Sequence, residues 1–139
     1  MRQSILRYFI SLLLVSLCIC SATSIFIISG SMKEDSEREM MYSVKLIEYN
    51  LDYSGDLNKQ IETLNPLAFS DDTRISVIDE KGKVLADTYK NDISSNHLKR
   101  EEVQQALHSS NHEGYAMRRS ETTNQPLLYA AYYKDNHII

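Results

Sequence analysis

Three of the four histidines, all of which lie in the C-terminal half of the chain, are the first side chains whose type could carry chemistry. His108 and His112 are four residues apart, a spacing at which two imidazoles can share a metal ion when both lie on one helix face. The residues between them, 109–111, are Ser-Ser-Asn, which predicts a loop instead. No Cys, Asp or Glu completes a familiar ligand pattern, and His97 stands apart. We therefore expect solvated or structural histidines and no metal site.

Arg118 is better suited to bind a ligand. Its guanidinium offers five donors in a planar fork that fits a carboxylate or a phosphate. It alternates with the small residues Ala116 and Ser120, which leaves space beside its stem. The alternative is an internal role, in which Arg118 pairs with Glu102 or Glu121 of the same chain. The residue types alone leave both interpretations open.

Catalysis has little support in the sequence. Ser, His and Asp are all present, but neither a nucleophile elbow nor an HExxH motif accompanies them. We predict no catalytic residue and no cofactor within these 139 residues.

The distribution of charge argues against nucleic acid as a partner. Two of the 15 basic side chains, Arg2 and Arg7, and none of the 19 acidic ones precede residue 30. Residues 31–139 thus carry 13 basic and 19 acidic groups, a net charge of −6, without the basic cluster that phosphates require. Both cysteines, Cys18 and Cys20, lie in the apolar N-terminal stretch, which excludes a disulfide-stapled miniprotein and a Cys-ligated zinc fold.

The N-terminal stretch predicts a transmembrane helix. No side chain from Tyr8 to Ile28 is charged, and a helix of that length spans roughly 31 Å, close to the ~30 Å core of a bilayer. A cleaved signal peptide is the alternative, but the apolar run continues past the one small-x-small site, residues 21–23. Because arginines precede the span, the positive-inside rule places residues 1–7 in the cytoplasm, 8–29 in the cell membrane and 30–139 outside.

The segment after the span carries an apolar stripe at helical spacing. Its members are four, three and four residues apart: Met40, Val44, Ile47 and Leu51. Gly55 is expected to cap the end of this helix. The stripe could pack on the chain's own sheet or along a second copy in a parallel homodimer, and the spacing alone does not choose between them.

Beyond this helix the pattern changes to short helices and strands. We expect helices at 58–64 and 100–107, strands at 74–79, 83–87, 115–120 and 127–133, a tight turn at 79–82, and loops at 88–96, 109–114 and 121–126. This order predicts an α+β unit built on an antiparallel sheet. Residues 137–139 resemble the start of another strand, so the pattern also predicts a fragment that is truncated at its C-terminus.

Three stretches of the outer segment form a recognisable series. They are RISVIDEKGKVLAD at 74–87, NHLKREEV at 96–103, and the region 114–131 with Gly114-Tyr115, Arg118-x-Ser120-x-Thr122 and Leu128-Tyr129-Ala130-Ala131. In this order after a transmembrane helix, they resemble the extracytoplasmic domain of sensor histidine kinases of the phosphate-regulon and cell-wall-regulator type.

The resemblance implies a PAS-like, single-Cache fold with a five-stranded sheet. The last strand normally lies inside that sheet, so the resemblance also implies that this strand is missing from the fragment, which would leave an open edge. It implies that the complete protein is an ATP-dependent, Mg²⁺-dependent protein-histidine kinase with a second membrane helix, a HAMP linker and a response regulator as partner. None of that machinery is encoded in these residues.

In such a fold a pocket lies between the sheet face and the connecting loop and helix. The candidate ligand residues are His97, Arg100, Tyr115, Arg118 and Tyr129, with Arg119 and Tyr132 beside them. The ligand would be an unidentified small molecule or envelope signal. The alternatives are structural: His97 caps the helix at Arg100, and the tyrosines form sheet surface.

The expected function is therefore sensory input to a two-component histidine kinase, working as a homodimer because a sensor passes motion between paired helices. The same module on a chemoreceptor or a cyclic-dinucleotide enzyme is one alternative. A membrane-tethered binding protein is the other.

Overall fold

The structure is a computed structural model that describes residues 2–70, 72–89, 96–120 and 124–139. The chain divides into two compact units, Met1–Ser36 and Glu37–Ile139, and helix α1, Arg2–Asn50, extends through both. Most of the loop predicted at 88–96 and half of the one predicted at 121–126 lie outside the described residues.

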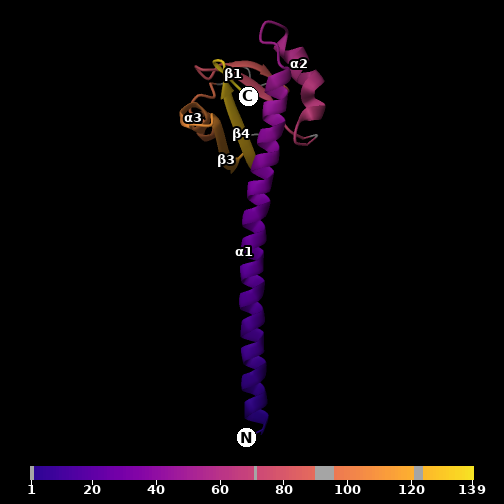
Figure 1. Ribbon diagram of the computed structural model, residues 1–139, viewed down its shortest axis with the longest axis vertical. Helices are drawn as coiled ribbons and strands as arrows, with labels where there is room; N and C mark the ends of the chain where they lie inside the picture. The colour runs from indigo at the N-terminus through magenta and orange to yellow at the C-terminus, as the bar shows by residue number, and fades with distance from the viewer. Residues whose placement is uncertain (1, 71, 90–95, 121–123) are drawn as a thin grey trace. The chain divides into compact units, whose positions relative to one another are not determined.

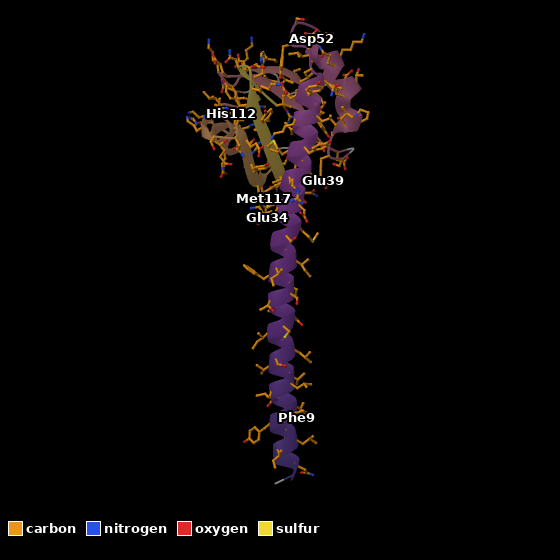
Figure 2. All side chains as sticks on the ribbon, in the orientation of Figure 1. Phe9, Glu34, Glu39, Asp52, His112 and Met117 are labelled. Carbon is orange, nitrogen blue, oxygen red and sulfur yellow. The ribbon has the colours of Figure 1, made fainter. Side chains whose placement is uncertain are left out.

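In the first unit, α1 is apolar on all sides. Its large side chains project away from the helix, as Phe9 does in Figure 2, and Phe26 is 82% exposed. The hydroxyls of Ser11 and Ser16 donate to the carbonyls of Tyr8 and Leu13 at 2.9 and 3.1 Å, so the helix satisfies its own polar groups. The helix is long and apolar enough to cross a membrane.

In the second unit, the predicted stripe covers the chain's own core. Ile47 is 2% exposed and belongs to a buried cluster, against which Val44 and Leu51 also pack. The other members of that cluster are Ile61, Ile75, Val77, Ala86 and Ile139. Of the two packings left open for the stripe, Ile47 therefore takes the one on the chain's own sheet, and the homodimer stays a prediction.

Helix α1 ends at Asn50, so Gly55 is not its cap. The side chain of Gln60 holds the chain just after the helix: its amide oxygen accepts from the Asp52 N–H at 2.7 Å, and its nitrogen donates to the Asp52 carbonyl at 2.8 Å. Gly55 lies in the turn that follows and donates to Asp52. The side chain of Gln60, from the next helix, thus orders the segment that the sequence predicted Gly55 would order.

The remaining elements confirm the α+β prediction. The helices are α2, Leu57–Leu64, a 3-10 turn at Asn65–Leu67, and α3, Glu101–His108. The strands are β1, Ser76–Asp79, β2, Val84–Asp87, β3, Glu113–Arg119, β4, Pro126–Lys134, and β5, His137–Ile138. They form one antiparallel sheet in the order β2-β1-β5-β4-β3, so the strand expected at 137–139 lies inside the sheet.

The two faces of this sheet carry separate cores. One face packs on the outer part of α1 and on α2 through the Ile47 cluster. The other packs on α3 through a second buried cluster: Ile78, Val84, Val103, Ala106, Ala131 and Ile138 (Figure 1). Gly114 lets α3 lie directly on β3, since a Cβ there would overlap the Glu102 carbonyl and the Ala106 nitrogen.

The turn between β1 and β2 forms as predicted. The Gly82 N–H donates to the Asp79 carbonyl at 2.9 Å, and the Asp79 carboxylate accepts from the N–H groups of Lys81 and Lys83. Gly82 has a φ of 79°, a conformation that favours glycine, and a Cβ there would overlap Leu98. The loop before α3 therefore packs tightly on this turn.

Candidate functional site

Arg118 lies in an internal contact on the α3 face of the sheet. Its Nη2 donates to Oε1 of Glu102 at 3.3 Å, and its guanidinium carbon lies 3.7 Å from the centre of the Tyr129 ring. Glu102 comes from the first turn of α3. Its side chain is 6% exposed, against 26% for Arg118. Of the two interpretations of Arg118, the internal pair with Glu102 is the one observed, and Glu121 lies outside the described residues.

The pair is only half made. Oε2 of Glu102 and Nε of Arg118 are both buried, and neither has a hydrogen-bond partner among the residues that the structure describes. A buried polar atom without a partner costs roughly 1–3 kcal/mol. Two arrangements would satisfy both atoms: closure into a two-bond carboxylate–guanidinium pair, or a bridging group that donates to Oε2 and accepts from Nε. Either arrangement would add contacts that the observed pair lacks.

Tyr115 does not join this site. Positions 115 and 118 on β3 differ by an odd number, so their side chains lie on opposite faces of the sheet. The Tyr115 hydroxyl donates to Glu113 at 3.1 Å, and burial, then this bond and the charges of Glu113 and Glu37, raise its pKa to about 12. Tyr132 lies on the same α1 face, under Lys45 at 5.1 Å.

His97 is buried, with 2% of its surface exposed, and its backbone forms two hydrogen bonds. Its N–H donates to the Gly82 carbonyl at 2.8 Å, and its carbonyl accepts from the Arg100 N–H at 3.0 Å. Arg100 is the N-terminal cap residue of α3, which has no side-chain cap. The alternative in which His97 caps this helix is thus observed for its backbone carbonyl, which accepts from the N-cap residue.

The other two histidines lie in separate environments. His108 contacts the Gln104 carbonyl at 2.8 Å through Nδ1, whereas His112 meets the Tyr133 ring edge-on at 5.6 Å. Among the described residues, no group of three or more His, Cys, Asp or Glu side chains is placed to hold a metal ion.

Sequence reasoning missed the ion pairs that join the outer part of α1 to the sheet. Lys45 contacts Glu113 of β3 at 2.6 Å, and Lys134 of β4 donates to Glu48 at 2.8 Å. The hydrogen bond to Glu48 raises the pKa of Lys134. The partners lie 68 and 86 residues apart, and no local spacing signals a pair of that kind.

Tyr53 and His137 form a second unforeseen contact. Their rings stack with centroids 3.9 Å apart at 18°, which joins the loop after α1 to β5. The Tyr53 hydroxyl is buried and has no hydrogen-bond partner in the described part of the chain. Burial, followed by the charges of Glu48 and Asp135, raises the pKa of Tyr53 to about 12.

A cavity of about 250 Å³ lies between the end of α1 and α2. It is lined by Asn50, Lys59, Gln60, Thr63 and Leu64. None of the predicted ligand residues borders it, so it does not coincide with the Arg118 site.

Comparison of the chain with protein-family models, with curated proteins and with solved structures finds no match.

Proposed function

We propose that this chain is the sensory input of a membrane-bound two-component sensor histidine kinase. The observation that carries the proposal is the course of α1, which runs from an apolar span into an α+β unit with a five-stranded antiparallel sheet. An antiparallel sheet with its last strand inside is the arrangement that the resemblance to PAS-like, single-Cache sensors implies. The arginines before the span support an N-terminus in the cytoplasm and a sensory unit outside.

The proposed signal acts by shifting the outer unit between two packings. Two ion pairs, Lys45–Glu113 and Lys134–Glu48, connect the sheet to the helix that leads to the membrane. A change at the sheet can therefore alter the forces on α1. The half-made contact between Arg118 and Glu102 is the candidate point of entry, because α3 and β3 meet there.

The proposal includes a homodimer, but one that forms through a different face of α1 from the one that carries Ile47. Tyr42 and Tyr49 are seven residues apart on α1 and are 69% and 82% exposed. They lie opposite the buried Ile47 face, so a parallel partner helix would contact this side.

Radiolabelled ATP tests the proposal on the complete product of the gene in membrane vesicles. Acid-labile, alkali-stable phosphate on histidine is the expected result. As a matched control, removal of residues 30–139 should leave the labelling but abolish its response to the medium. A product that carries no phosphohistidine under any condition would contradict the kinase, and would favour the chemoreceptor, the cyclic-dinucleotide enzyme or the tethered binding protein.

A further inference from the structure

The end of the hairpin formed by β3 and β4 carries exposed apolar side chains on both of its faces. Met117 is 60% exposed and Leu127 is 41% exposed. Leu127 lies opposite Arg118, on the face that packs on α3, whereas Met117 lies on the other face, opposite Leu128. A protein partner covers one contiguous patch. Apolar side chains on both faces of one hairpin end therefore fit a medium that surrounds this end better than a single docking surface.

Hydrogen bonds between described residues close this end of the hairpin. The Ser120 N–H donates to the Gln125 carbonyl at 2.8 Å, and the Asn124 N–H donates to the Ser120 carbonyl at 2.9 Å. Arg119 is exposed, and its Nη1 donates to the Asn124 carbonyl at 3.0 Å. We call residues 117–119 and 124–127 the β3–β4 tip. It combines apolar side chains with one exposed cation at a defined end of the sheet.

Within the second unit, β3 runs back along α1 towards the first residue of that unit, Glu37. Glu113, at the start of β3, contacts Lys45 of α1 at 2.6 Å, and the charge of Glu37 acts on Tyr115. The step from Glu113 to Met117 covers ~13 Å of strand, and the step from Lys45 to Glu37 covers ~12 Å of helix. Met117 therefore reaches the level of Glu37 along α1, and Figure 2 shows it at this end of the unit.

The chain holds Glu37 close to the span. The charge-free run ends at Ile28, and α1 continues from there to Glu37 with a rise of ~13 Å. The headgroup layer on each side of a bilayer takes up roughly 5–7 Å of that distance. The end of the second unit that carries the β3–β4 tip is therefore the end that the chain keeps nearest to the lipid.

We propose that the β3–β4 tip contacts the lipid headgroups beside the span, with Met117 and Leu127 in the interface and the Arg119 guanidinium at the phosphates. The proposal rests on the membrane span within the proposed function, but not on the kinase. Met117 and Leu127 supply apolar area to the interface. The bond from Arg119 to Asn124 uses one of the five N–H donors of a guanidinium, a group suited to phosphate oxygens. The outer unit then meets the membrane through two elements, α1 and the tip.

Quenching by spin-labelled lipids tests this contact on the complete chain in phosphatidylcholine vesicles. The chain carries Cys18→Ala and Cys20→Ala, and one cysteine with a bimane fluorophore replaces Gln125, Lys59 or Val15 in turn. Gln125 is an exposed residue of the tip, Lys59 is an exposed residue of α2 beyond the far end of α1, and Val15 lies in the span. We expect a lipid with a nitroxide on its headgroup to quench position 125 several-fold more strongly than position 59. A lipid with a nitroxide on its acyl chain should quench position 15, because the span lies in the bilayer.

Two further variants separate apolar contact from mere nearness to the lipid. With Met117→Asp and Leu127→Asp together, the new charges favour water over the interface, so headgroup quenching at position 125 should fall to the value at position 59. The matched control is Tyr89→Asp, which replaces an apolar side chain of similar exposure, 58%, outside the tip. This control should leave the quenching at position 125 unchanged.

Equal headgroup quenching at positions 125 and 59, with position 15 still quenched from the acyl chain, would overturn the proposal while the span stands. The tip would then be a surface for a protein partner. Weak quenching at all three positions would overturn the span together with the proposal. Quenching at position 125 that survives both aspartates would show a tip near the membrane without apolar contact, which also contradicts the proposal. Phosphohistidine labelling of the complete gene product is independent of all three outcomes.

Discussion

Arg118 and Glu102 form an ion pair at 3.3 Å in which the carboxylate is nearly buried and the guanidinium is stacked on a tyrosine ring. Replacement of Arg118 by Ala leaves that carboxylate without a partner. We predict a loss of about 1–3 kcal/mol in the free energy of unfolding. The matched control is Arg119→Ala, because Arg119 is exposed and should contribute less than ~0.5 kcal/mol.

A double variant separates the effect of the ion pair from the effect of side-chain packing. Arg118→Met with Glu102→Met removes both charges and keeps side-chain volume, so it should be less destabilising than Arg118→Ala alone. Denaturant unfolding of the parent chain, Arg118→Met, Glu102→Met and the double variant provides a double-mutant cycle. A cycle without coupling would mean that the pair is incidental, and Arg118 would again be a candidate for an external anion.

Alkaline pH should destabilise the outer unit through Tyr53 and Tyr115, whose pKa values are raised to about 12. Above pH 10 the unfolded chain loses phenolic protons that the folded chain still holds, so stability falls between pH 10 and 12. The free energy of unfolding of Tyr53→Phe and of Tyr115→Phe should each fall less steeply with pH over this interval than that of the parent chain. Parallel curves for the variants and the parent chain would contradict the raised pKa values.

At neutral pH the two phenylalanine substitutions should change the stability of the folded chain in different directions. The Tyr53 hydroxyl is buried without a partner, so Tyr53→Phe should be neutral or stabilising. Tyr115→Phe removes a donor to Glu113 and should destabilise by roughly 0.5–1.5 kcal/mol. Thermal unfolding of both variants at pH 7 checks the order.

Gly82→Ala should cost more than ~1 kcal/mol, because the residue has a positive φ and the new methyl group meets Leu98. Gly30→Ala is the matched control: a Cβ there meets no atom within 4 Å, and the helical position favours alanine. Thermal unfolding that ranks the two variants in the opposite order would show that the turn adapts to a side chain.

The membrane topology can be tested with single cysteines at Gln3 and Lys59, in a chain that carries Cys18→Ala and Cys20→Ala. An impermeant maleimide applied to intact cells should label position 59 alone. Labelling at position 3 alone would reverse the proposed orientation.

The sequence predicted the elements that depend on local rules. Periodicity located α3 within one residue at each end, and the Asp79–Gly82 turn formed because its chemistry lies within four residues. Tyr129 and Tyr132 of β4, which the candidate pocket had grouped together, contact Arg118 and Lys45 on opposite faces of the sheet.

Features that depend on distant partners escaped prediction. The chain after α1 is held by Gln60 rather than by Gly55, because a side chain from the next helix forms hydrogen bonds with both backbone groups of Asp52. The stripe that includes Ile47 was open to two packings, and only the folded core decides between them. The candidate set failed to converge at Tyr115 because it was assembled by residue type, while strand parity sends that side chain to the other face.

Gly114 carries a consequence for the evolution of this chain. With α3 resting on its backbone, every other amino acid would lift the helix from the sheet and separate Glu102 from Arg118. Substitution of this residue is therefore disfavoured by packing alone, whatever the chain binds. In related chains we expect glycine here to outlast both members of the ion pair, which makes it a better marker of common descent than any charged residue of the site.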